Sequence, residues 1–349
     1  ISHPFYYAIS LAKMHGPFST LGLAEDTWAL NEGVIDEDGF LKQTYDIYEE
    51  RKRLFLDHLG RNKEGLTVSV FDTTDRIQHM FFRYLDADHP ANADKDTSSH
   101  KHAVEQAYVG ADELVGRVME QIDRRDLLMV ISDHGFKPFK WGVNLNSWLW
   151  KEGYLVLEDG ASPGGNWFEN VNWAETRAYA YGLAGIFINT RGREKFGTVE
   201  PSHEKEALAG EIKEKLENLV DEQNACKPIR RAVLSQHEFS GPYTADAPDL
   251  LIGFETGYRA SWNCATGKVT QAIFEPNTKR WSGDHSIDPP LVPGSFFSNW
   301  KLKQTKPEIS IMDIAPTVLN LFGIEKPRFQ DGKVFDLTRP PVRQGIGEN

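Results

Sequence analysis

The chain has 349 residues, 40% of them hydrophobic, and its formal net charge of −12 comes from 39 basic and 51 acidic residues. This composition predicts a soluble globular protein with a substantial core, since no apolar run approaches the roughly 20 residues of a membrane helix. The negative charge argues against a broad nucleic-acid-binding surface, which requires a basic patch. It does not exclude an anionic substrate, because a bound metal ion can reverse the local field.

The two cysteines, Cys226 and Cys264, define neither a disulfide framework nor a zinc knuckle. We expect them to be buried free thiols. The first residue is Ile1, and the opening "ISHPFYYAISLAKMHG" lacks the charged start and cleavage site of a signal peptide. We therefore expect the sequence to be cut from a longer polypeptide, and its cellular compartment is left open.

Helices and short strands alternate in the first part of the chain. Apolar residues in 40–60 recur with helical spacing and predict a helix ending at Gly60, while "LTVSVF" (66–71) predicts a short buried strand. Thr73 or Thr74 could cap a helix through "DRIQHMFFRYLD", and a polar loop over 86–102 follows. A helix over 103–123 and a second buried strand, "LLMVIS" (127–132), come next. This order predicts an α/β architecture with a mostly parallel sheet.

The middle of the chain, about residues 137–280, is more mixed and is rich in Trp, Asn and Gly. It predicts a helix over 203–220 and strands over 184–189 and 248–254. A last helix over 310–324 has clear boundary signals. Asp313 can cap it, Pro316 lies in its first turn, and Gly323 ends it.

Polar side chains follow both predicted buried strands. Asp72 and Asp75 follow the first, and Asp133 and His134 of "SDHG" follow the second. Because ligands bind beyond the carboxyl ends of parallel strands, we expect these residues to share one rim of the sheet. His285, in the Gly/Pro-rich stretch "WSGDHSIDPP", could reach the same rim.

These residues have the chemistry of metal ligands. Asp75 and His79 are four residues apart and would share one face of a helix. Imidazole and carboxylate suit zinc, and carboxylates also suit manganese. With His285 and one open position, the set describes a catalytic zinc site. Asp133 and His134 would begin a second site, and two ions about 4 Å apart can hold the attacking and leaving oxygens of a phosphoryl displacement.

Each signal also has an ordinary structural explanation. An Asp-x-x-x-His pair on a helix is usually a solvated pair, and "SDHG" after a strand is often a turn with a cap. His100 and His102 in "SSHKH" could hold a stray ion, but a solvated loop fits that composition better. The metal interpretation gains strength because the separate signals fall where one fold would bring them together.

Three motifs in order, "TDRIQH", "SDHGF" and "GDHS", resemble the alkaline phosphatase superfamily. The chain is most similar to its type I phosphodiesterase/nucleotide pyrophosphatase branch, which "VNLNSWLWKEGYL", "APDLLIGFETGYR" and "DIAPTVLNLFGI" also resemble. The resemblance covers nearly the whole chain. A cofactor-independent phosphoglycerate mutase would place its last ligand much closer to His134 than His285 lies.

The resemblance implies a three-layer α/β/α sandwich, alkaline phosphatase-like, with a mostly parallel sheet. We expect residues 1–349 to form one catalytic domain that lacks its N-terminal segment, with 137–280 as an insertion or cap-like region near the active site. Two divalent metal ions are implied, Zn²⁺ first and Mn²⁺ as the alternative. The residues that match ligands of one ion are Asp75, His79 and His285, and those that match the other are Asp133 and His134.

The chain departs from the family pattern in one respect. The second ion also needs an Asp from an earlier strand, and the nucleophile is a Thr or Ser at a helix start; neither has a match before residue 60. We expect both upstream of residue 1. The nearby substitutes within the chain, Thr73, Thr74, Asp72 and Asp284, fit better as helix caps and as groups that support the ligands or face solvent.

Two asparagines and an arginine are candidates for substrate contact. Arg259 in "GYRASW" could bind phosphate bidentately, although a surface ion pair is an equal alternative. Asn144 and Asn146 in "VNLN" could face substrate, although helix capping is the stronger alternative for them.

The sequence therefore predicts a metal-dependent hydrolase of phosphate esters, acting on phosphodiesters or nucleotide pyrophosphates. An upstream hydroxyl ionised by the second metal would attack phosphorus, and water at the first metal would release the phosphorylated enzyme. The expected partner is a small-molecule phosphate ester or nucleotide, with no nucleic-acid surface and no membrane. A sulfatase or phosphonate hydrolase of the same superfamily and a catalytically silent metal-binding domain remain alternatives, although no cysteine lies near the ligand motifs.

Overall fold

The computed structural model describes residues 2–20, 24–93, 97–303 and 308–339, and the chain divides into two compact units. The first unit comprises residues 1–111 and 136–292, and the second comprises residues 112–135 and 293–349. Among the described residues, no helix is both long enough and apolar enough to cross a membrane.

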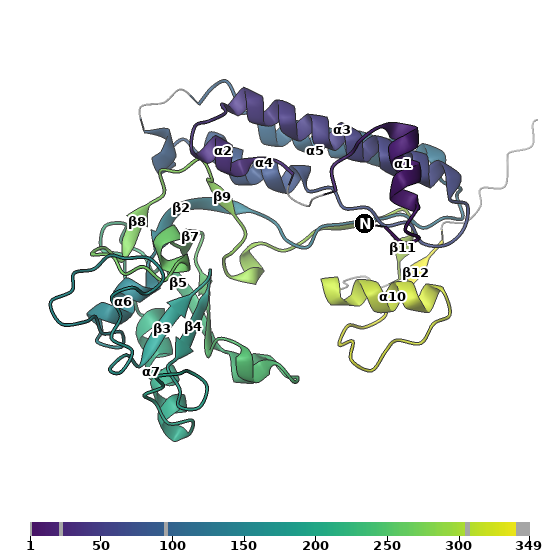
Figure 1. Cartoon of the computed structure of the whole chain (residues 1–349). Coiled ribbons are helices and arrows are strands. Elements are labelled where there is room, and N and C mark those ends of the chain that lie inside the picture. Colours follow the sequence, from purple (N-terminus) through teal and green to yellow (C-terminus); the bar gives the residue numbers. More distant parts are fainter. Residues whose placement is uncertain (1, 21–23, 94–96, 304–307, 340–349) are drawn as a thin grey trace, which may run out of the picture. The chain divides into compact units, whose positions relative to one another are not determined.

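Helices make up the N-terminal part of the first unit (Figure 1). The predicted helix ending near Gly60 is confirmed, and it begins earlier because Asp36 accepts a hydrogen bond from the Gly39 amide at its N-terminus. The next long helix, predicted over 103–123, is also confirmed. The elements are α1 (Tyr7–His15), α2 (Thr27–Asn31), α3 (Glu37–Arg61), α4 (Thr73–Phe81), the 3₁₀ turns η1 (Phe82–Leu85) and η2 (Pro90–Asn92), and α5 (Ala103–Gln121), which continues into the second unit.

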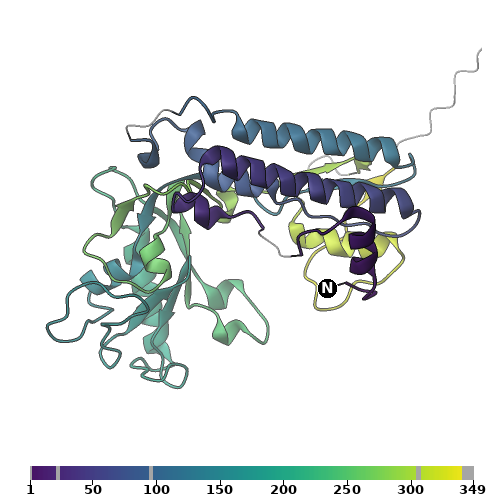
Figure 2. The ribbon, with the colours of Figure 1, turned by 45° about the horizontal axis from the view of Figure 1, so that its top comes forward.

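An apolar cluster fixes α4 against its neighbours. Phe40 of α3 and Ile77, Met80 and Phe81 of α4 are fully or almost fully buried together with the first turns of α5. α3 and α4 lie side by side, as Figure 2 shows. Burying each such side chain contributes about 1.5–3 kcal/mol, so the helix that carries Asp75 and His79 is held in place by packing. The polar loop predicted over 86–102 contains η2, and its residues 94–96 lie outside the described part of the chain.

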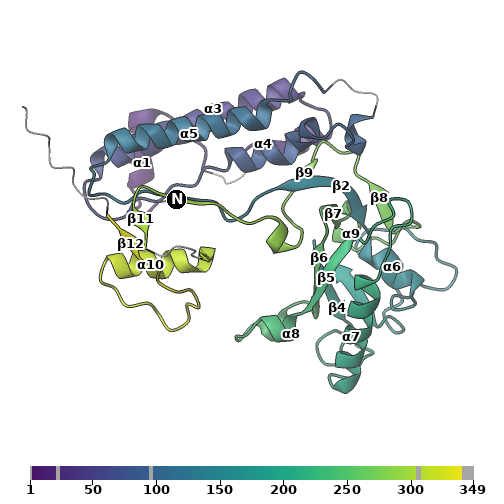
Figure 3. The same cartoon turned by 180° about the vertical axis from the view of Figure 1, so that it is seen from behind.

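Two sheets form the rest of the first unit. The antiparallel sheet has the order β3 (Ala178–Tyr181), β4 (Gly185–Ile188), β6 (Leu250–Phe254) and β5 (Ile229–Leu234), and α7 (His203–Glu217) packs against β5. In the other sheet β2 (Lys137–Val143) is central. It pairs with β7 (Gly257–Ala260), β8 (Phe274–Pro276) and β9 (Gly283–Asp284), as Figure 3 shows. The short elements are α6 (Leu145–Lys151), α8 (Ser235–Glu238), η3 (Thr244–Asp246), α9 (Trp262–Ala265) and η4 (Pro289–Leu291).

The second unit is smaller. β1 (Met129–Ile131) pairs with β10 (Phe296–Ser298), and β11 (Lys301–Leu302) pairs with β12 (Leu337–Thr338), both antiparallel. The predicted last helix is confirmed as η5 (Ile311–Asp313) followed by α10 (Ile314–Leu321). Ser310 and Asp313 form a capping box at its start, and Gly323 follows its end in the left-handed region with φ +69°.

The mixed α/β class is confirmed, but the described strands do not form a mostly parallel sheet. β2 and β7 are parallel, whereas the other pairs of named strands are antiparallel. The connection from β3 to β4 shows the cause, because a short turn through Gly182 at φ +73° permits only an antiparallel return. The three-layer sandwich and the single domain with an insertion stay predictions.

The stretch "LTVSVF" is extended but is not a buried strand. Leu66, Val68 and Val70 are 55%, 75% and 78% exposed. Within the described residues no strand pairs with this stretch. The composition correctly favours extended backbone, but burial requires a neighbouring strand, which local propensity does not supply. The second predicted strand, β1, is likewise only half-buried, and Ile131 is exposed.

Glu37 links α3 to distant parts of the first unit. Its Oε1 is 2.7 Å from Arg83 Nη2 and 3.0 Å from Arg280 Nε. Burial alone would raise the pKa of Glu37, but its backbone hydrogen bond and the two arginines outweigh this effect and lower the pKa. A carboxyl whose pKa is lowered by folding stabilises the protein at pH values above its pKa in the unfolded chain. That stability is lost as the pH falls through its pKa in the folded protein.

Glu37→Gln is therefore expected to lower the free energy of unfolding by about 1–2 kcal/mol at neutral pH, because a charge-assisted contact is lost. The difference from the wild type should shrink as pH falls below 4.5, the ordinary glutamate value. Urea denaturation of both proteins at neutral pH and at a pH below 4.5 measures the difference in unfolding free energy and its dependence on pH. A difference that stays constant over this range would contradict the assignment.

Candidate metal centre

Three of the predicted ligands come together in the first unit. Asp75 and His79 lie on one face of α4, with Asp75 Oδ1 3.4 Å from His79 Nε2. His285, which follows β9, places its Nε2 3.8 Å from the same carboxylate oxygen. One ligand atom from each residue lies within 4.8 Å of the others. Residues more than 200 positions apart therefore meet because β9 packs against α4.

The position and tautomer of His79 are fixed by β9. His79 Nδ1 is 2.8 Å from the carbonyl oxygen of Gly283. Because a carbonyl can only accept, Nδ1 carries a hydrogen, and Nε2 is the nitrogen that faces Asp75. A metal-binding histidine needs this arrangement, with its second nitrogen held by a backbone or carboxylate acceptor.

Close approach of β9 to α4 requires a glycine at position 283. A Cβ there would lie 2.5 Å from the Gln78 carbonyl oxygen and 2.7 Å from Phe82 Cβ. The preceding residue, Ser282, donates its amide hydrogen to the His79 carbonyl at 2.6 Å. The backbone of β9 is thus joined directly to the last turn of α4.

Aromatic rings shield one side of the centre. Trp281 stacks on the His79 imidazole with ring centroids 3.8 Å apart, and Phe136 meets the same ring edge-on at 4.8 Å. His79 is consequently buried, whereas the side chains of Asp75 and His285 are 22% and 31% exposed. The centre is closed behind His79 and open to solvent at the other two ligands.

The electrostatics favour a cation. Burial alone would raise the pKa of Asp75, but His79, Arg76 and His285 outweigh this effect and lower the pKa. The carboxylate is therefore ionised at neutral pH. One carboxylate and two imidazoles, one of them oriented by a backbone carbonyl at its Nδ1, form a donor set that fits a divalent ion such as zinc.

Asp133 and His134 belong to the second unit and follow β1 after one intervening residue, Ser132. His134 Nε2 is 3.5 Å from Asp133 Oδ2, and the Asp133 side chain is largely exposed. Their assignment to a second metal ion stays a prediction.

The three candidates for substrate contact, Asn144, Asn146 and Arg259, are all buried. Asn144 is fully buried and accepts a hydrogen bond from the Ser147 amide, so the capping alternative is confirmed at α6. Asn146 is also fully buried and bonds the backbone of Ala180. Arg259 is 1% exposed, so it forms neither a surface ion pair nor an accessible phosphate contact.

Other candidate residues are engaged in local contacts. Asp72 forms an ion pair with Arg51. The cap expected from Thr73 is not formed, because its hydroxyl has no hydrogen-bond partner among the described residues. His100 lies 2.9 Å from Asp38, and His102 lies 2.8 Å from Glu105.

Both cysteines are free thiols, and Cys264 is fully buried whereas Cys226 is half-buried. The residues that sequence analysis missed are Trp281 and Gly283. Both lie within four residues of His285 in "WSGDHS", and this proximity in sequence could have identified them.

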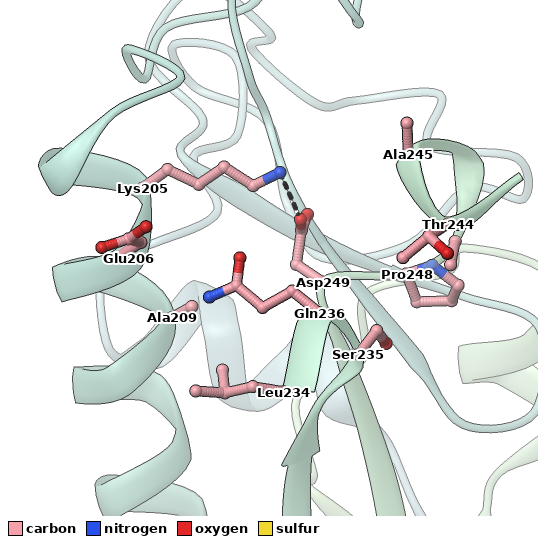
Figure 4. Close-up of a pocket in the computed structure, with 11 residues that line it drawn as sticks. Lys205, Glu206, Ala209, Leu234, Ser235, Gln236, Thr244, Ala245, Pro248 and Asp249 are labelled. Carbon is pink, nitrogen blue, oxygen red and sulfur yellow. Dashed lines mark ion pairs between the residues drawn. The ribbon is translucent and has the colours of Figure 1, made fainter. Parts of the chain in front are cut away.

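A pocket of about 180 Å³ lies elsewhere in the first unit, beside α7 and the end of β5. Figure 4 shows Lys205 reaching from α7 to Asp249, with their charged atoms 2.6 Å apart. Asp249 also pairs with Arg193 at 2.7 Å. Its carboxylate is already neutralised by two cations, and none of the three clustered ligands lines this pocket.

Comparison with known proteins agrees with this centre. The family model for type I phosphodiesterase / nucleotide pyrophosphatase matches residues 23–288, which is most of the chain and includes all three clustered ligands. The chain belongs to this family. The resemblance seen in the motifs is thereby confirmed, and the members of the family are hydrolytic enzymes that are generally metal-dependent. No curated protein matches the chain in a direct sequence comparison.

Proposed function

We propose that the protein hydrolyses phosphate esters, with phosphodiesters or nucleotide pyrophosphates as substrates and divalent metal ions as cofactors. The observation that carries this proposal is the convergence of Asp75, His79 and His285 in a chain of the type I phosphodiesterase/nucleotide pyrophosphatase family. The donor set favours Zn²⁺, with Mn²⁺ as the alternative.

Each residue of the centre has a distinct task in this proposal. Asp75 supplies the negative charge, and Gly283 holds His79 so that its Nε2 points to the shared site. Trp281 and Phe136 exclude water from the rear of His79, and the exposed edges of Asp75 and His285 leave room for a phosphate group. A divalent ion bound here would act as a Lewis acid toward a phosphoryl oxygen.

The proposal also assigns a second metal site, a nucleophile and a region that shapes substrate choice. Asp133 and His134 are proposed to hold a second ion, and a Thr or Ser hydroxyl is proposed as the nucleophile. Residues 137–280 are proposed as the insertion that shapes substrate choice within a three-layer α/β/α catalytic domain. The family membership and the placement of Asp133 and His134 just beyond the end of β1 support these assignments.

Parallel assays on three chromogenic esters test the function. Bis(p-nitrophenyl) phosphate, p-nitrophenyl phosphate and p-nitrophenyl sulfate present a diester, a monoester and a sulfate ester with the same leaving group. We expect the diester to be hydrolysed fastest, the activity to disappear after chelation, and Zn²⁺ or Mn²⁺ to restore it. Preference for the sulfate ester would instead favour the sulfatase alternative. Zinc binding without turnover of any ester would favour the catalytically silent alternative.

A further inference from the structure

A buried carboxylate lies directly behind the metal centre. Asp284 precedes His285, and only 4% of it is exposed. Its Oδ1 accepts hydrogen bonds from the amides of His285 and Ser286, both at 2.8 Å, and its Oδ2 accepts one from Trp281 Nε1 at 2.9 Å. A single side chain thus holds the backbone of one ligand and the ring that stacks on another.

The charge that balances Asp284 comes from β7. Arg259 Nε lies 2.8 Å from Asp284 Oδ2. The rings of Phe139 and Trp262 contact the guanidinium, each with its centroid 4.3 Å away. Arg259 is only 1% exposed, so water does not replace it as the partner of the carboxylate.

From these contacts we propose that Arg259 is a positioning residue for the metal centre, acting through Asp284 on His285 and Trp281. The inference rests on the proposed metal-dependent function. β7 lies within residues 137–280, the region proposed to shape substrate choice. The inference gives β7 a second role, which is to support the metal ligands through Arg259. β7 and β9 both pair with β2, which gives the arginine and the carboxylate a common frame.

The physical reason is the cost of an unpaired buried charge. Without Arg259, the Asp284 carboxylate would be a buried charge with no countercharge, and it would turn toward water. That movement weakens its bonds to the His285 and Ser286 amides and to Trp281. Residues that orient metal ligands in this way typically change metal affinity about 10–100-fold when they are replaced.

The test measures zinc affinity by competition with a chromophoric chelator, together with the visible spectrum of the Co²⁺-substituted protein. Arg259→Met and Asp284→Asn are each expected to weaken zinc binding about 10–100-fold and to alter the Co²⁺ bands. Arg259→Lys keeps the charge and should recover part of the affinity. Because Arg259→Met leaves a buried charge, the neutral double variant Arg259→Met/Asp284→Asn is measured beside it, and circular dichroism establishes which variants fold.

Arg193→Met is the matched control, because it removes an arginine from Asp249, another aspartate of the same unit, whose side chain is 8% exposed. It should lower stability and leave zinc affinity unchanged. Wild-type affinity in every folded variant of Arg259 and Asp284, or equal weakening in Arg193→Met, would overturn the inference while leaving the proposed function intact. If His79→Ala and His285→Ala also both leave zinc binding unchanged, the metal centre itself is refuted and the inference falls with it. Asp284→Asn alone decides the matter if the arginine variants do not fold.

Discussion

His79→Ala is expected to remove one equivalent of bound zinc and to lower diester hydrolysis by about 10²-fold or more. The substitution deletes one of three clustered donors and also the ring that Trp281 covers, so the remaining carboxylate and imidazole cannot hold the ion firmly. Elemental analysis after dialysis gives the zinc content, and hydrolysis of bis(p-nitrophenyl) phosphate gives the rate. His285→Ala should have the same effect on both measurements.

His102→Ala provides the matched control for these variants. His102 is exposed, and it contacts Glu105 on α5 rather than the clustered ligands. Its replacement should leave zinc content and rate as in the wild type. Unchanged zinc content in both His79→Ala and His285→Ala would refute the assignment of the first metal ion.

Gly283→Ala should damage the fold and the metal centre together. The added methyl group meets the Gln78 carbonyl oxygen at 2.5 Å, which is backbone of α4 and cannot rotate away. β9 must therefore move outward, which costs about 3 kcal/mol of unfolding free energy, at the upper end of typical overpacking. The same movement lengthens the contact between His79 Nδ1 and the Gly283 carbonyl and displaces His285, so zinc affinity should fall at least about tenfold.

Gly210→Ala makes the same chemical change at a position with open space. A Cβ at Gly210, within α7, meets no atom within 4 Å. Alanine there should stabilise the protein by about 0.5–1 kcal/mol, because glycine is unfavourable inside a helix. Denaturant titrations and zinc competition on both variants separate the two outcomes. Equal stability of Gly283→Ala and the wild type would show that α4 and β9 do not need their close contact.

The helices were predictable because their signals are local. Asp313 before α10 and Gly323 after it act within one turn of the helix that they bound. Strand positions such as β4 and β6 followed from short apolar runs, but strand direction did not. Direction depends on which segments meet in space, and a turn such as the one at Gly182 is too small a signal to reveal a whole sheet.

The ligand types were predictable because metal chemistry restricts them to a few residues. The spacing of Asp75 and His79 identified a shared helix face, and "GDHS" identified His285. The support behind them was not predictable. Arg259 reads as an ordinary surface arginine in sequence, and only the packing of Phe139 and Trp262 around it shows why a cation is buried there.

The extended stretch at Leu66, Val68 and Val70 has a practical consequence for anyone handling the protein. A solvent-facing row of valine and leucine side chains, on backbone that pairs with no strand in the described part of the chain, is a template on which molecules can aggregate. The net charge of −12 keeps molecules apart in dilute buffer, but this repulsion reaches only about 10 Å at 0.1 M salt. Purification and storage at low ionic strength and modest concentration follow from this one segment.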